Sequence, residues 1–88
     1  MKESTMEGLI AFRDEGIPPG DFLRAVLENN LMEAFSRADG ENTRDMAEIM
    51  EFVYNDMPVD CHGSREKVNA WLDRKIQERE AMNKKLSK

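Results

Sequence analysis

The apolar residues between Phe22 and Phe35 recur every three or four positions, and this spacing limits the fold more than any other feature of the sequence. Such spacing places side chains on one face of an α-helix, whereas a half-buried strand needs alternation, which the chain does not show. The pattern predicts one long amphipathic helix that starts at an Asp21 N-cap and ends at Asp39-Gly40. Its apolar face consists of Phe22, Leu23, Val26, Leu27, Leu31, Ala34 and Phe35.

A shorter helix is expected before this one. Ser4 and Glu7 have the capping-box spacing, in which two side chains satisfy amides of the first helical turn. Gly16 can take the left-handed conformation that ends a helix, and Pro18 and Pro19 prevent its continuation. The N-terminal helix carries few apolar residues and needs packing partners; they are Leu9, Ile10 and Phe12.

Two further helices are expected in the second half of the chain. One is capped by Asn42 or Thr43 and ends at Pro58, and its apolar series is Met46, Ile49, Met50, Val53 and Met57. The other follows a turn at residues 59–63 and is capped by Ser64, and its apolar face is Val68, Trp71, Leu72 and Ile76. Residues 77–88 form a charged tail, which we expect to be a partly frayed helix.

These elements predict an all-α fold, a compact bundle of three principal helices plus a short N-terminal helix, within a single domain of residues 1–88. A chain of 88 residues buries only about 60 to 65% of the surface that its unfolded form exposes. Its core is therefore thin, and we expect it to associate with copies of itself. Seven methionines supply apolar volume that suits an interface between subunits as well as an interior.

The distribution of charge makes duplex DNA a poor partner. Residues 1–60 carry 5 basic and 14 acidic groups, and residues 61–88 carry 8 basic and 4 acidic groups. This polarity could favour head-to-tail contacts between copies, although such a charge distribution is more often only a solvated surface. The single cysteine cannot form an internal disulfide, and neither a leader nor an apolar run of about 20 residues is present. We therefore expect a reducing cytoplasm and no membrane association.

Cys61-His62 is the only pair that suggests catalysis or metal binding, and it suggests them weakly. A structural zinc site would need two more nitrogen or sulfur ligands, and the chain has no other Cys or His. A thiol nucleophile would need a base from another part of the fold. No Walker loop, dinucleotide-binding fingerprint or nucleophile elbow is present. We expect a binding protein with no catalytic residue, metal or cofactor, and a packing role for the turn.

Two segments present features that attract phosphate. The segment from Ile17 to Arg24 combines a Pro-Pro-Gly-Asp turn with a helix start and a basic side chain in the first turn. The segment from Gly63 to Lys67, which includes Ser64 and Arg65, also combines a flexible turn with a helix start and basic side chains. Free amides and the positive end of the helix dipole favour anions at such places. Helices often begin with these residue types, so ordinary solvated caps remain the alternative.

Three aromatic residues could stack on a nucleobase. Phe12, Tyr54 and Trp71 each offer a face that accepts any base at a gain of roughly 1 to 3 kcal/mol. Each could instead belong to the core. Phe12 is the preferred candidate, because it lies on a weak helix next to the Pro-Pro-Gly turn.

A family resemblance rests on three stretches of sequence. They are Gly16 to Leu31 (GIPPGDFLRAVLENNL), Arg37-Ala38-Asp39, and Cys61 to Val68 (CHGSREKV) followed by Trp71. Over roughly residues 8–72 the chain resembles the phage anti-CBASS cyclic-oligonucleotide sponges, a family of small tailed-phage proteins. The resemblance implies a homohexamer in the host cytoplasm that sequesters cyclic dinucleotides between subunits and cyclic trinucleotides in separate pockets where three subunits meet. It implies that neither ligand is cleaved.

The resemblance also implies roles for particular residues. Arg24 and Arg65 would contact phosphate, with Ser64 and Lys67 beside them, Gly20 would allow close approach of the ligand, and Phe12 would stack on a base. The family's aromatic residue tends to be a tyrosine, and a phenylalanine would lose the hydrogen bond of the hydroxyl. The alternative function is an acidic helical phage protein that binds a host protein through a Met-rich surface, as inhibitor or adaptor.

Overall fold

Six α-helices and one turn of 3-10 helix account for most of the chain. The computed structural model describes the backbone of residues 1–86 and the side chains of residues 1–82. The described part contains no strand, so the predicted all-α class is confirmed. The elements are α1 (Glu3–Glu15), α2 (Asp21–Leu27), α3 (Leu31–Arg37), α4 (Gly40–Arg44), α5 (Met46–Asp56), the 3-10 turn η1 (Val59–Cys61) and α6 (Arg65–Leu86).

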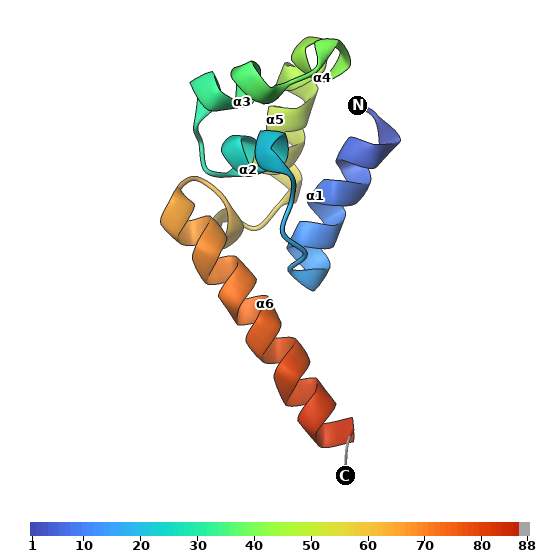
Figure 1. The fold of residues 1–88 in the computed structure, drawn as a ribbon, viewed down its shortest axis with the longest axis vertical. Helices are drawn as coiled ribbons and strands as arrows, with labels where there is room; N and C mark the ends of the chain where they lie inside the picture. Colours follow the sequence, from blue (N-terminus) through green and yellow to red (C-terminus); the bar gives the residue numbers. More distant parts are fainter. Residues whose placement is uncertain (87–88) are drawn as a thin grey trace.

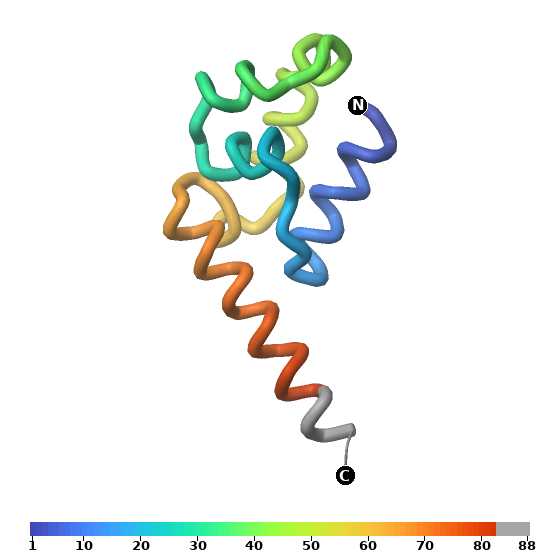
Figure 2. The backbone as a smooth tube through the Cα atoms, viewed as in Figure 1, coloured from blue at the N-terminus to red at the C-terminus, as the bar shows by residue number. Residues whose placement is uncertain are grey.

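Helices α1 to α5 gather into a head, and α6 leaves the head as a long arm (Figure 1). Figure 2 shows that the chain runs from the lower end of α1 up to α2. Helices α3, α4 and α5 then complete the head. The first half of α6 packs beneath the head against η1, α1 and α2. The second half projects away from it, which gives the molecule extents of 49 × 25 × 21 Å.

One main core joins the head to the first two turns of α6. Its fully buried members include Phe12 of α1, Leu27 of α2 and Ile49 of α5, and burying such a side chain contributes about 1.5–3 kcal/mol. The contribution from α6 ends at Leu72, and the described side chains from Asp73 to Met82 add nothing to this core. The core consists of Leu9, Phe12, Leu23, Leu27, Ile49, Val53, Met57, Cys61, Val68, Trp71 and Leu72.

Gly16 ends α1 as the sequence predicts. Its φ of 68° lies in the left-handed region, and its N–H donates to the carbonyl of Phe12 at 3.1 Å. A Cβ at Gly16 would lie 2.3 Å from the Cβ of Lys75, so α6 packs directly on this turn. The glycine is needed twice, once for its conformation and once for the close approach of α6.

The prediction of one long helix between Asp21 and Asp39 is wrong, because the chain forms two helices there, α2 and α3. The chain turns at Asn29, the one residue other than glycine with a positive φ (63°) in the described backbone. Asn30 then caps α3, and its side chain accepts a hydrogen bond from the N–H of Glu33 at 3.3 Å. Asparagine tolerates the left-handed conformation and is a good N-cap, so two adjacent asparagines favour a break over continuation.

The helix expected between residue 42 or 43 and Pro58 is also divided. Asp39 caps α4, since its carboxylate accepts from the N–H of Asn42 at 2.7 Å, and neither Asn42 nor Thr43 is the cap. Helix α5 begins afresh at Met46 after Asp45. The described chain therefore has six α-helices instead of a bundle of three principal helices with one short addition, and α1 with 13 residues is longer than α2 with 7.

Three predicted N-caps have different outcomes. The Ser4–Glu7 capping box does not form, because α1 begins at Glu3 with Lys2 in the cap position. Asp21 is the first residue of α2, and Gly20 is its cap. Ser64 does cap α6, and its hydroxyl accepts from the N–H of Lys67 at 3.1 Å.

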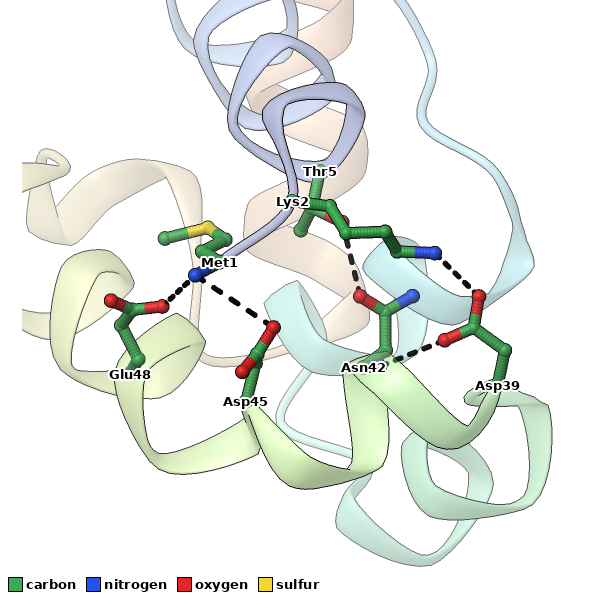
Figure 3. A network of polar contacts seen from close by, with 7 residues as sticks. All are labelled: Met1, Lys2, Thr5, Asp39, Asn42, Asp45 and Glu48. Atoms are coloured by element: carbon green, nitrogen blue, oxygen red, sulfur yellow. Dashed lines mark hydrogen bonds and ion pairs between the residues drawn. The ribbon is translucent and has the colours of Figure 1, made fainter.

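A network of hydrogen bonds and ion pairs connects the start of α1 to α4, α5 and their N-caps (Figure 3). The buried hydroxyl of Thr5 donates to the side-chain oxygen of Asn42 at 3.0 Å. Lys2 pairs with Asp39, and the amino group of Met1 pairs with Glu48, with Asp45 3.7 Å away. Polar groups therefore close this end of the head, next to the side chain of Met1, which packs against the main core.

Helix α6 continues without a break through most of the expected tail, up to Leu86. Residues 87–88 of the tail expected at 77–88 lie outside the described residues. Within residues 1–86, no helix combines the length and the apolar character that crossing a membrane requires.

Candidate functional site

Three arginines from three helices line one groove on the head. Arg24 comes from α2, Arg37 from α3 and Arg65 from the first turn of α6. The groove has a volume of about 280 Å³, and three carboxylates, those of Asp21, Glu28 and Glu33, share its walls. We call it the arginine groove. Two residues predicted to contact phosphate, Arg24 and Arg65, therefore lie at the same site.

Two of these arginines are held by neighbouring side chains. Arg24 donates from Nε to Glu28 at 2.8 Å and from a terminal nitrogen to Asn69, which links α2 to α6. Arg37 donates from Nε to Glu33 at 2.8 Å, and this hydrogen bond raises the pKa of the guanidinium. The i, i+4 spacing of both pairs is the usual one for ion pairs on a helix. Both guanidinium groups are thus oriented and partly neutralised.

Arg65 differs from the other two arginines. It is exposed, and within the described side chains it takes part in no ion pair or side-chain hydrogen bond. A guanidinium presents five N–H donors in a planar fork that matches phosphate. The donors of Arg65 are free to meet an anion in the groove.

The turn before α2 is less suited to an anion than the sequence suggests. Gly20 is extended, with φ −69°, and a Cβ there would meet no heavy atom within 4 Å. The fold itself does not require glycine at this position. Asp21 occupies the first turn of α2 and partly neutralises the positive end of the helix dipole.

The second predicted segment divides between two places. The hydroxyl of Ser64 already caps α6. Arg65 faces the arginine groove, whereas Lys67 lines a different groove next to His62. Of the six predicted site residues, the structure brings together Arg24 and Arg65.

Phe12 lies in the core and has 0% exposed surface. Its ring packs among the core residues, and its carbonyl accepts a hydrogen bond from the indole of Trp71, which is also buried. In a single chain the ring has no face open to a ligand, and we leave it out of the site proposed below. Tyr54 is 80% exposed and is the aromatic residue with a free face among the three considered.

A second groove, which the sequence reasoning missed, lies between α2, α5 and the turn before α6. We call it the histidine groove. Its volume is about 290 Å³, and most of its wall is apolar. The sequence signal for this groove was weak. Met50 and Tyr54 are spaced to lie on one face of α5, but no sequence pattern predicts that they contact the segment before α6. The groove is lined by Val26, Asn29, Met50, Val53, Tyr54, Val59, His62, Gly63 and Lys67.

His62 lines this groove and also carries a buried polar atom. Its Nε2 is the one buried side-chain nitrogen or oxygen atom that lacks a hydrogen-bond partner within residues 1–82. Burial lowers the pKa of His62 below 6.5, and the charge of Lys67 adds to this effect, while a hydrogen bond to the backbone of Met57 opposes it. The imidazole is therefore neutral near pH 7.

Cys61, the neighbour of His62, is fully buried in the main core. Burial raises the pKa of its thiol to about 11, so that the thiol stays protonated at neutral pH. A protonated, inaccessible thiol is a poor nucleophile. Across the described residues, no three His, Cys, Asp or Glu side chains lie close enough together to hold a metal ion.

Comparison with known protein families, with curated proteins and with solved structures finds no match to this chain. A functional assignment must therefore come from the residues themselves and from the two grooves.

Proposed function

We propose that this protein binds cyclic di- and trinucleotide second messengers and sequesters them without cleaving them, and that the arginine groove contacts ligand phosphates. The observation that supports the proposal best is that Arg24 and Arg65, which are far apart in the sequence, line one groove together with Arg37. Planar guanidinium groups bind phosphate through paired hydrogen bonds, which are about twice as strong as neutral ones. A ring with two phosphates offers partners to Arg24 and Arg65, and a third phosphate offers one to Arg37.

Binding at this groove would proceed by exchange of partners. Arg65 contacts a phosphate first, because its donors are free. Arg24 then turns toward a second phosphate while keeping its anchor on Asn69 and releasing Glu28. The nearby carboxylates restrain affinity for simple anions, so a ligand must supply more than one phosphate.

The proposal includes assembly of several copies. A volume of about 280 Å³ lies below the range of about 300–1,000 Å³ that encloses a drug-sized ligand. A cyclic dinucleotide is therefore larger than one arginine groove, and a neighbouring copy has to cover the rest of it. We propose the homohexamer implied by the family resemblance, acting in the host cytoplasm as a phage protein that removes the signal of an anti-phage defence.

Native mass spectrometry of the full chain with a panel of cyclic di- and trinucleotides tests this function. We expect an oligomer, with hexamer as the predicted size, that carries ligands of unchanged mass. Arg65→Ala should remove the bound ligand and keep the oligomer, whereas Arg79→Ala, on the exposed arm of α6, should change neither. A protein that stays free of every ring offered, or that releases cleaved products, would overturn the proposal.

An exposed apolar face supports a second candidate function. Leu31, Met32 and Phe35 of α3 are exposed, Met32 by 87%. Exposed apolar groups of this kind can mark a surface for another protein. The second candidate is an acidic phage protein that docks on a host protein through this face, as inhibitor or adaptor. Met32→Glu should abolish capture of one stoichiometric host protein under that function and should leave cyclic nucleotide binding unchanged under the first.

A further inference from the structure

Exposed apolar side chains from three elements form one continuous surface on the head. The histidine groove and a smaller pocket beside it share Val26, Asn29 and Met50, and the smaller pocket also includes Leu31. The surface therefore runs from α3 across α5 to η1. Exposed apolar groups gathered in this way mark a surface for another molecule. We call it the apolar strip, and its members, each at least 38% exposed, are Leu31, Met50, Tyr54 and Val59.

The arm of α6 carries a second uncovered apolar surface. Ile76 is 40% exposed and Met82 is 64% exposed, since the main core ends at Leu72. Ile76, Arg79 and Met82 follow one another at three-residue spacing, so they form one ridge on the helix surface. Helix α6 runs without a break away from the head (Figure 1). The ridge therefore does not reach the apolar strip of its own chain.

Charge favours a second copy of the chain as the partner of both surfaces. Residues 1–60, which hold the whole apolar strip, carry 5 basic and 14 acidic groups, a net charge of −9. Residues 61–88, which include the arm, carry 8 basic and 4 acidic groups, a net charge of +4. An arm on a head brings opposite charges together, whereas two heads or two arms would bring like charges together.

The residues beside the apolar strip fit an arm as its occupant. Glu51 precedes Tyr54 by one turn of α5, and Asp60 follows Val59, and both carboxylates are exposed. They offer partners to Arg79, which stands between the two apolar residues of the ridge. An amphipathic helix that lays its apolar side into an apolar groove is a common mode of recognition.

We propose that two copies of this chain pair by laying the arm of each against the apolar strip of the other. Ile76 and Met82 pack on the strip, Arg79 meets the carboxylates beside it, and Lys67 in the wall of the histidine groove meets Glu80 of the arm. A two-fold pair makes this contact twice. The inference goes beyond the proposed function, because the pair forms whether or not a nucleotide is bound.

Sedimentation of the full chain without nucleotide tests the pairing. We expect the parent to associate. Tyr54→Lys and Ile76→Glu should each raise the dissociation constant at least about tenfold, because each places an unpaired charge in an apolar contact. Both positions are exposed, so the fold should persist, which circular dichroism checks.

Two matched controls add the same charges elsewhere on the same helices. Asn55→Lys lies on α5 but lines other grooves than the histidine groove. Gln77→Glu lies on α6 and points about 200° away from Arg79. Both variants should associate as the parent does.

A mixture of the two interface variants gives the sharpest result. In a mixed pair, one contact is that of the parent, and the other sets the lysine at position 54 against the glutamate at position 76. Opposite charges then face each other, so an equimolar mixture should associate again. Arg65→Ala should leave association unchanged, so the failure of this inference and the failure of the proposed function are distinguishable.

Three results would overturn the inference. One is a parent protein that stays monomeric at millimolar concentration. Another is association that Tyr54→Lys or Ile76→Glu leaves unchanged, since a contact between two heads or between two arms would be sensitive to one of them alone. The third is a mixture of these variants that associates no better than either variant by itself.

Discussion

The indole N–H of Trp71 points at the end of α1 and donates to the carbonyls of Phe12 and Arg13, at 3.2 Å each. One side chain of α6 thus supplies a donor to the carbonyl of Arg13 and a second donor to the carbonyl of Phe12, which also accepts from the N–H of Gly16. Arg74 and Lys75 lie over the same ring, both 5.1 Å from its centre. Trp71 therefore joins the arm helix to the head by packing, hydrogen bonding and cation–π contact.

Trp71→Phe should lower the free energy of unfolding by about 1–3 kcal/mol, because it removes the donor to the part-buried carbonyl of Arg13 and one of two donors to the carbonyl of Phe12, and because it shortens a core side chain. Urea unfolding followed by circular dichroism measures the change. Gln77→Ala on the exposed arm is the control and should stay within about 0.5 kcal/mol. Equal stability of the phenylalanine variant and the parent would show that the indole N–H contributes nothing.

Gly16→Ala should destabilise the protein by at least about 2 kcal/mol. A left-handed alanine costs about 1–2 kcal/mol, and the added Cβ would also press against Lys75 at 2.3 Å. Gly20→Ala is a matched control with open space and a negative φ, and its effect should stay below about 1 kcal/mol. Thermal unfolding of both variants checks the difference, and similar values would mean that α6 does not pack on the Gly16 turn.

Thr5 and Asn42 should be coupled, because their hydrogen bond is buried between α1 and α4 (Figure 3). Thr5→Val and Asn42→Ala should each destabilise the protein by about 1–3 kcal/mol. The double variant should cost less than their sum, with a coupling of about 0.5–1.5 kcal/mol. A double-mutant cycle in urea measures it, and strictly additive values would contradict the contact.

Cys61 should react only after unfolding. Burial raises the pKa of its thiol from 9.0 to about 11, so the native state holds the proton more tightly than the unfolded state. The stability that this contributes is present below about pH 9 and is lost as the pH rises toward 11. Mass spectrometry with iodoacetamide at pH 8 should show slow modification that accelerates in urea. Fast modification of the native protein would place the thiol at the surface.

Part of the fold follows from local rules that the sequence displays. Gly16 and Ser64 mark helix ends with the chemistry that their positions predict, and the spacing of Ile49 and Val53 identifies a buried helix face. The break at Asn29 was missed because asparagine is compatible with a helix interior, a turn or a cap. Those options differ by less than about 1 kcal/mol, and tertiary packing decides among them.

The candidate site was predictable only in part. Arg24 and Arg65 were singled out by their places at helix starts, but their meeting in one groove depends on how α2 and α6 pack. The separation of Lys67 from Arg65 was open to prediction, since residues two apart on a helix point about 200° apart. The burial of Phe12 and the histidine groove arise from contacts among several helices, which no local pattern contains.

Isothermal titration calorimetry with cyclic GMP-AMP tests the central claim most directly, with the parent protein, Arg65→Ala and Arg79→Ala side by side. The claim predicts saturable binding at micromolar concentrations or below to the parent and to Arg79→Ala, a loss of at least about tenfold in affinity for Arg65→Ala, and recovery of the intact ring after denaturation. The absence of binding to the parent at concentrations far above a micromolar, or binding that Arg65→Ala leaves unchanged, would contradict it.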